Sequence, residues 1–160
     1  MNVNTKMKQI LERSKVDENK IVDLLSGIQN VMNPKFKNIH GCLIIDNEDA
    51  LTEEKVNIQR ILNMYGDKTG YEASCNEVRI NDFLEDEGLT ENELIQLGLI
   101  IADKWREKLG KSFQKNQYVF ILVSNEGYVT LRFHMKRDEE KEWLNYDLEK
   151  YQEAVAVMYG

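Results

Sequence analysis

Arg132 and His134 are the side chains best placed for chemistry, because they stand two residues apart in the apolar segment Thr130–His134. Side chains two apart on a strand share one face. Together with Asp147 or Glu142, such a pair would bind a phosphate group or transfer a proton. The sequence favours a simpler interpretation, in which the pair lies on a solvated sheet face and forms salt bridges with the acidic loop that follows.

A cysteine nucleophile would need a histidine and a third, orienting group. Cys42 lies two residues after His40, but no orienting group is evident, and the apolar run Gly41–Ile45 is typical of a small buried side chain. We therefore interpret His40 as a loop residue. Cys42 and Cys75 are predicted to be reduced core thiols, and no catalytic residue is predicted.

Two acidic segments resemble cation-binding loops only in part. Asp46–Asp49 begins like a calcium loop, but the sixth position is Leu51 instead of glycine and the twelfth-position glutamate is absent. A second, denser acidic stretch is more typical of a solvated loop. It comprises Asp82, Glu85, Asp86 and Glu87. Zinc-ligand spacings and glycine-rich phosphate loops are missing, so no metal and no cofactor are predicted.

Negative charge is concentrated in the middle third of the chain. Residues 41–93 hold 14 acidic and 4 basic side chains, residues 1–40 hold 4 and 7, and residues 94–160 hold 10 of each. Such an excess attracts basic surfaces and repels nucleic acid. The candidate partner-binding residues are Asp46, Glu48 and Asp49 on one loop and Glu77, Asp82, Glu85, Asp86 and Glu87 on another. The alternative for each is that it only keeps the protein soluble.

Helical and strand periods outline the N-terminal half. The predicted elements are a helix over 6–13, a helix capped by Asp17 and ended by Asn33–Pro34, a strand over 41–45, a helix from Thr52 to Tyr65, a loop over 68–77 and a brief strand over 77–81.

The C-terminal half begins with the clearest helix. Thr90 and Glu93 form a capping-box signature, an apolar residue then follows every three to four positions as far as Leu109, and Gly110 ends the helix. Strands over 118–123 and 128–134 form a hairpin, and apolar residues on both faces of the first predict that both faces are covered. A short amphipathic helix over 143–151 and a strand over 154–159 complete the chain.

These elements predict an α+β fold with helices packed on an antiparallel sheet, ending as helix–hairpin–short helix–strand. Residues 1–160 are expected to form a single domain, with a helical N-terminal segment over 1–40 and an α+β core over 41–160. No apolar run approaches the roughly 20 residues that cross a bilayer, and the polar start is unlike a signal peptide, so we expect a cytoplasmic protein.

From about Ser74 onward the chain resembles small bacterial immunity proteins encoded beside polymorphic or contact-dependent toxins. The residues that carry the resemblance are Thr130–His134, Glu142–Leu144 and Asp147–Tyr151. The resemblance implies a protein that binds one cognate toxin domain and blocks its active site, with no catalytic residue. Many toxin domains are nucleases with basic clefts, which an acidic surface would fit.

The sequence leaves two other functions open. One is a regulatory or interaction module, monomeric or weakly dimeric through the edge of the C-terminal strand. The other is a small enzyme that uses Arg132 and His134 on a phosphorylated substrate. Trp143 and Tyr151 are residue types that often anchor protein interfaces, although their helical spacing is more typical of core residues. Neither nucleic acid nor a membrane is an expected partner.

Overall fold

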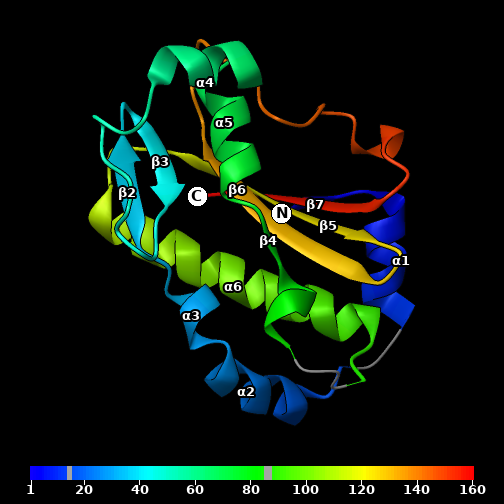
Figure 1. The fold of residues 1–160 in the computed structure, drawn as a ribbon. Coiled ribbons are helices and arrows are strands. Elements are labelled where there is room, and N and C mark those ends of the chain that lie inside the picture. The colour runs from blue at the N-terminus through cyan, green and yellow to red at the C-terminus, as the bar shows by residue number, and fades with distance from the viewer. Residues whose placement is uncertain (14–15, 85–87) are drawn as a thin grey trace.

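An antiparallel sheet of five strands lies at the centre of the computed structural model, which describes residues 1–13, 16–84 and 88–160 (Figure 1). In spatial order its strands are β1 (Asn2–Val3), β7 (Ala154–Tyr159), β5 (Tyr118–Asn125), β6 (Tyr128–Met135) and β4 (Val78–Arg79). A separate hairpin pairs β2 (Phe36–Ile39) with β3 (Cys42–Ile45). The predicted α+β class is confirmed.

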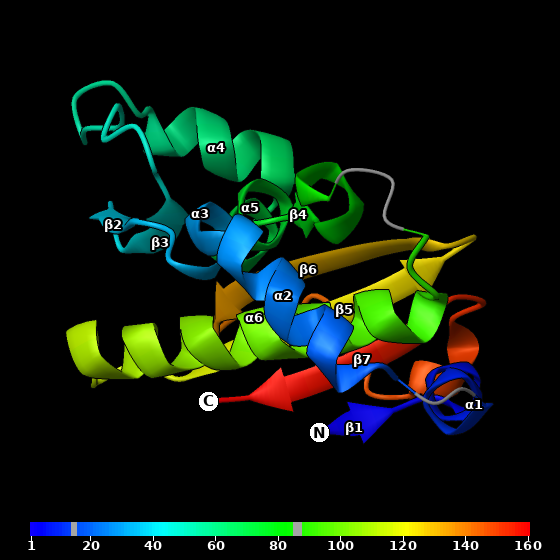
Figure 2. The ribbon, with the colours of Figure 1, turned by 90° about the horizontal axis from the view of Figure 1, so that it is seen from below.

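Helices pack around this sheet, and the longest covers one of its faces. Seen from below, this helix, α6 (Glu91–Ser112), crosses the strands with α2 (Glu18–Gly27) on its outer side (Figure 2). The helices are α1 (Thr5–Arg13), α2 (Glu18–Gly27), α3 (Gln29–Met32), α4 (Ile58–Tyr65), α5 (Lys68–Cys75) and α6 (Glu91–Ser112), with the 3₁₀ turns η1 (Ile80–Phe83) and η2 (Leu148–Lys150). Within the described residues, no helix is both long and apolar enough to span a membrane.

The core between α6 and the sheet is built around aromatic rings. Trp105 of α6 meets Phe36 of β2 and Phe133 of β6 edge to face, with ring centroids 6.2 and 5.9 Å apart. Such arrangements place ring edges against ring faces and are favourable beyond the area they bury. The residues predicted to form the apolar face of α6 are all buried: Leu94, Leu97, Ile101, Trp105 and Leu109.

The predicted capping box at the start of α6 is confirmed. Thr90 Oγ1 accepts a hydrogen bond from the Glu93 amide at 3.2 Å, and Glu93 Oε2 accepts one from the Thr90 amide at 2.8 Å. The hydrogen bond from the Thr90 amide is the main cause that lowers the pKa of Glu93. At its other end the helix continues to Ser112, two residues beyond the predicted stop.

Thr90→Ala is expected to lower the free energy of unfolding by about 1 kcal/mol, because an amide of the first helical turn loses its acceptor. Urea denaturation followed by circular dichroism measures the loss. The matched control is Thr52→Ala, for which we expect a smaller change, because Thr52 Oγ1 accepts only a long contact of 3.4 Å from Lys55 N. Equal losses in the two variants would contradict the capping role of Thr90.

The opposite face of the sheet is covered at one end only. Val119, Ile121, Val155 and Val157 form a second apolar cluster on that face. The segment that follows β6 packs three side chains against it: Leu144, Leu148 and Tyr151. The expectation that both faces of β5 are covered therefore holds where this segment crosses it.

The prediction of a short helix over 143–151 is wrong. The segment is mostly irregular, and only Leu148–Lys150 forms a 3₁₀ turn. Its backbone amides use side-chain acceptors instead of helical carbonyls: Trp143 N donates to His134 Nε2, Asn145 N to the Tyr151 hydroxyl, and Asp147 N to Asn145 Oδ1. Such hydrogen bonds compete with those of a helix. The apolar residues of the segment instead pack on the sheet face.

The loop predicted over 68–77 is also wrong, because Lys68–Cys75 forms helix α5. Asp67 caps its first turn by accepting from Gly70 N at 2.7 Å, and Glu140 accepts from Thr69 N at 2.8 Å. The buried residues of this helix include Tyr71 and Ala73, but polar side chains are buried beside them and obscure any hydrophobic period. These polar side chains are Thr69, Glu72 and, one residue after the helix, Asn76.

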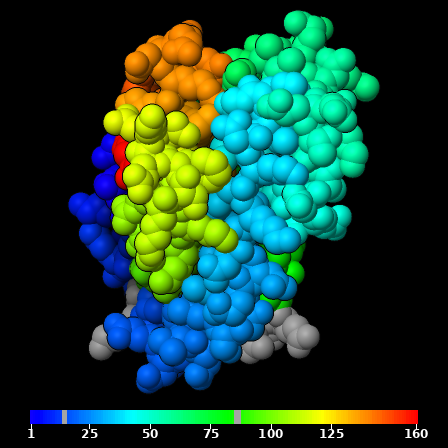
Figure 3. Space-filling model, turned by 90° about the vertical axis from the view of Figure 1, so that its left-hand side faces the viewer, coloured from blue at the N-terminus to red at the C-terminus, as the bar shows by residue number. Residues whose placement is uncertain are grey.

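Two smaller differences concern the hairpin region. Helix α4 begins at Ile58 with Asn57 as its N-cap, whereas Thr52 begins only a turn. Strand β2 was not predicted. In Figure 3 the hairpin lies beside the C-terminal end of α6, where Lys108 Nζ donates to Pro34 O at 2.7 Å. The first 40 residues thus contribute two strands as well as helices, and several of their apolar side chains join the core under α6.

Candidate partner-binding groove

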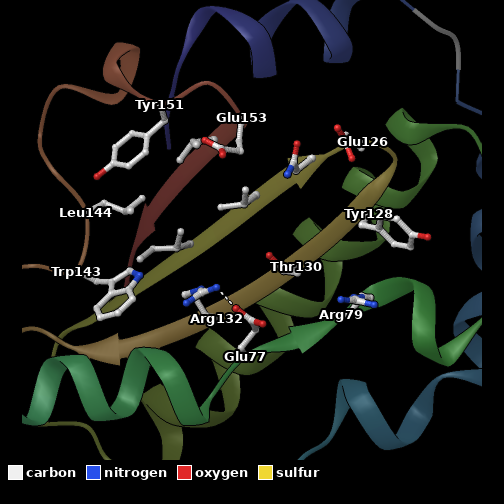
Figure 4. Close-up of a pocket in the computed structure, with 14 residues that line it drawn as sticks. Glu77, Arg79, Glu126, Tyr128, Thr130, Arg132, Trp143, Leu144, Tyr151 and Glu153 are labelled. Atoms are coloured by element: carbon white, nitrogen blue, oxygen red, sulfur yellow. Dashed lines mark ion pairs between the residues drawn. The ribbon is translucent and has the colours of Figure 1, made fainter. Parts of the chain in front are cut away.

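The part of the sheet face left open by the segment over 143–153 is a groove of about 490 Å³. Strands β4, β6, β5 and β7 form its floor, and Trp143, Leu144 and Tyr151 stand along one side (Figure 4). Half-buried Val123 supplies apolar surface in the floor, above the almost fully buried Ile121 and Val155. The groove therefore combines apolar surface in its floor with aromatic and charged side chains around it.

Arg132 and Trp143 define one end of the groove. The Arg132 guanidinium lies 5.8 Å from the Trp143 ring centroid and forms an ion pair with Glu77 (Figure 4). Arg132 also donates to the Ala73 carbonyl of α5 at 3.3 Å. Burial lowers the pKa of Arg132. Trp143 is 42% exposed, so an aromatic face is held open to solvent beside a charge that already has its partner.

Tyr128 and Arg79 stand at the opposite end, next to the β5–β6 turn. The Arg79 guanidinium lies 5.1 Å from the Tyr128 ring centroid, and its Nη1 lies 4.0 Å from Asp82 Oδ1. Glu126 and Glu153 also line this end (Figure 4). The Tyr128 end therefore carries carboxylates and faces the Trp143 end across the floor.

His134 does not reach the groove, although it lies on the same strand as Arg132. Its side chain is 1% exposed. Nδ1 donates to the Met135 carbonyl at 2.9 Å, and Nε2 accepts from the Trp143 amide at 3.4 Å, which selects the neutral Nδ1–H tautomer. Burial lowers the pKa of His134, against the opposing effect of the Met135 hydrogen bond. Both ring nitrogens are thus engaged, and Nε2 holds the segment that carries Trp143.

The first predicted acidic loop is largely structural. Asp46 is 8% exposed and accepts hydrogen bonds from Ala50 N at 3.0 Å and Leu51 N at 2.9 Å. The Leu51 bond is the main cause that lowers the pKa of Asp46. Asp49 pairs with Lys37 at 2.5 Å, and Glu48 is exposed. This loop lies at the hairpin, to the left of β4 (Figures 1 and 2).

The second predicted acidic loop is divided. Glu77 and Asp82 are exposed and pair with Arg132 and Arg79, so they lie at the edge of the groove. Glu85, Asp86 and Glu87 lie outside the described residues. Among the residues that the structure describes, the two acidic loops are therefore not brought together, and the prediction that each binds a partner stays a prediction.

The other candidate side chains occupy separate places. His40 follows β2 in the turn before β3, and its Nε2 lies 2.9 Å from the carbonyls of Glu53 and Val56, which fastens the loop before α4. Cys42 is buried as predicted, whereas Cys75 is exposed, which corrects its assignment to the core; both are free thiols. In the described part of the chain, no three His, Cys, Asp or Glu side chains gather as a metal site would require.

The sequence singled out Arg132 as a possible phosphate ligand and Trp143 as a possible anchor, but it favoured a surface salt bridge for Arg132 and a core position for Trp143. It gave no sign of the other end of the groove. The missing signal was the alternation of β6, which places Tyr128, Thr130 and Arg132 on one face. The register Arg79↔Thr130 then brings in the β4 edge. Glu126 and Glu153 were not predicted, because they lie in a turn and before a strand, outside the acidic middle third.

The fold and the groove define an α+β protein with an open, aromatic and charged sheet face. Against models of protein families, residues 2–159 match the family described as Uncharacterized protein PM0498 family, and the chain belongs to it. Neither the curated proteins nor the solved structures contain a match.

Proposed function

We propose that this protein binds and neutralises a cognate bacterial toxin domain by forming a one-to-one complex. The observation that supports this proposal is the exposed Trp143 beside Arg132 at the edge of a preformed groove. Trp, Tyr and Arg supply most hot-spot residues of protein interfaces. All three types line this groove, whose floor is partly apolar.

The rigidity of the groove strengthens the proposal. Trp143 is positioned by its own amide, which donates to His134, and Arg132 is fixed by Glu77 and the Ala73 carbonyl. Anchors that are ordered before binding reduce the entropic cost of association. In this proposal the protein is cytoplasmic, monomeric or weakly dimeric, and acts by occupancy without chemistry or a cofactor.

A regulatory interaction module would use the same groove and differs only in its partner. Co-expression with the product of the adjacent upstream gene separates the two functions. We expect that product to arrest growth, this protein to restore growth, and the two to purify as a one-to-one complex. Absence of both toxicity and a complex would contradict the immunity function and favour the module.

Trp143→Ala is expected to weaken the complex with the upstream gene product by about 30-fold, the effect typical of a central aromatic hot spot. Calorimetry or biolayer interferometry measures the change. The fold should persist, because the hydrogen bond to His134 comes from the Trp143 backbone. Trp143→Phe should lose less affinity. Met64→Ala should lose no affinity, because Met64 is a 65% exposed side chain on α4, away from the groove lining. A loss below about two-fold for Trp143→Ala would remove this residue from the interface.

A further inference from the structure

The two ends of the groove differ in how their charges are balanced. At the Trp143 end, Glu77 neutralises Arg132. At the other end, the carboxylates of Glu126 and Glu153 have no hydrogen-bond or ion-pair partner among the described residues. Arg79 pairs with Asp82 at 4.0 Å. The groove therefore presents uncompensated negative charge at one end only.

Strand register brings these two carboxylates to the same end. Ser124 pairs with Ala154, so Glu153 enters β7 beside the last residues of β5. Asn125 pairs with Tyr128 across the turn that contains Glu126. Figure 4 shows Glu126 and Glu153 at this end, with Trp143 and Arg132 at the other. A ligand that spans the groove thus meets acidic groups at one end and an aromatic ring at the other.

The turn itself does not account for a glutamate at position 126. Glu126 has φ +52° and Gly127 has φ +81°, the geometry of a two-residue type I′ hairpin. Asn, Asp and Gly suit the first of these positions better, because a longer side chain is strained at positive φ. The conformation of the turn therefore does not explain a glutamate at this position, whereas the position of its carboxylate at the end of the groove does.

Between the two ends, the floor presents Val123 and Thr130. Val123 is half-buried on the groove side of β5, and Leu144 is half-buried on the wall. Extending the proposed function, on which this inference rests, we propose that the groove binds an extended segment of a protein partner. The segment presents an arginine or lysine to Glu126 and Glu153, and an apolar side chain to Trp143 and Leu144. Charge complementarity selects this occupant over nucleic acid, which the free carboxylates repel.

A short peptide tests this chemistry without the natural partner. The probe is acetyl-Leu-Ser-Arg-Ser-Leu-amide, whose alternate side chains share one face when extended. Titration into the ¹⁵N-labelled protein should shift the Trp143 indole resonance and the Glu126 and Glu153 amides. Replacing the arginine by its neutral analogue citrulline should weaken binding about five-fold, the effect of one exposed charge pair. An equal affinity for both peptides, or shifts confined to another surface, would overturn the proposal.

The variant Glu126→Asn separates binding from folding. Asparagine suits the turn better than glutamate, so the variant should melt at a higher temperature than the parent while it binds the arginine peptide about five-fold more weakly. Glu139→Gln removes one exposed charge outside the groove and is the matched control, with unchanged affinity expected. Unchanged affinity in both Glu126→Asn and Glu153→Gln would overturn the proposal.

The two proposals fail in distinguishable ways. If the upstream gene product is neutralised but the arginine peptide does not bind the groove, the immunity function stands and the basic-segment inference fails. If the peptide binds the groove as expected but the upstream product is neither toxic nor bound, the inference stands and the immunity function fails. Shifts of the same groove resonances when an oligonucleotide replaces the peptide, or when the concentration of the protein alone is raised, would overturn the inference.

Discussion

Replacing Arg137 by leucine is expected to lower the free energy of unfolding by about 3–5 kcal/mol, the typical effect of removing one partner of a buried ion pair. The Glu72 side chain is 0% exposed and binds the guanidinium through both oxygens, at 2.7 and 2.9 Å. Without Arg137 a buried carboxylate loses its counter-charge. Urea denaturation at neutral pH measures the loss.

The loss should be large because Glu72 also joins two separate sheets. Its Oε1 accepts from Leu43 N of β3 and its Oε2 accepts from Met135 N of β6, both at 2.7 Å. One turn later, Asn76 accepts from Ile45 N and donates to the Leu43 carbonyl. The side chains of Glu72 and of Asn76, which directly follows α5, thus satisfy the outer edge of β3, as a neighbouring strand would.

A double variant distinguishes the buried charge from simple loss of packing. Glu72→Gln combined with Arg137→Leu removes both charges and keeps an amide oxygen for one backbone donor. We expect this pair to be less destabilised than the sum of the two single variants, by an interaction energy of about 1–3 kcal/mol. Additive losses, or a loss below about 1 kcal/mol for Arg137→Leu alone, would contradict the charge-pair explanation.

The acidic middle third shows how far composition predicts a surface. Several of its carboxylates stabilise local structure: Asp46 accepts backbone hydrogen bonds within a loop, Asp67 caps α5, and Glu93 completes the capping box of α6. The excess of charge was visible in the sequence, but its use was not. A carboxylate that caps a helix and one that faces a partner are the same residue type in the sequence, and only the folded structure distinguishes their roles.

Helix α6 and the β5–β6 hairpin were predictable, because their apolar periods and caps agree with their tertiary environment. Helix α5 was not, since its buried residues include Thr69 and Glu72 beside Tyr71 and Ala73 and show no regular apolar period. The segment over 143–151 failed in the opposite direction. Its apolar spacing imitates a helix, yet Leu144 and Leu148 pack on the sheet from an irregular backbone.

The same cause limited prediction of the groove. Arg132 and Trp143 lie eleven residues apart in the sequence and meet only because the chain folds back across β5. Glu126 and Glu153 come together through the register of three strands. The residue types indicated candidates for binding. The surface they form depends on long-range strand pairing, which the local spacing of apolar residues does not reveal.

Trp105→Ala is expected to lower the free energy of unfolding by about 3–5 kcal/mol, because a fully buried aromatic ring leaves a cavity. Trp105 lies where three regions of the chain meet. Its ring packs against Phe36 and Phe133, and its Nε1 donates to the Val31 carbonyl of α3 at 2.7 Å. The residue therefore connects the N-terminal segment to the sheet through α6.

Trp105→Phe isolates this connection, since it keeps an aromatic ring and removes the indole donor. The unpaired Val31 carbonyl should cost about 1–3 kcal/mol. Hydrogen exchange locates the effect: if the first 40 residues fold together with the sheet, protection should fall in α3 and in the sheet alike. Loss of protection confined to α2 and α3 would instead show that the N-terminal segment opens by itself, and that the single domain expected for residues 1–160 consists of two units of unequal stability.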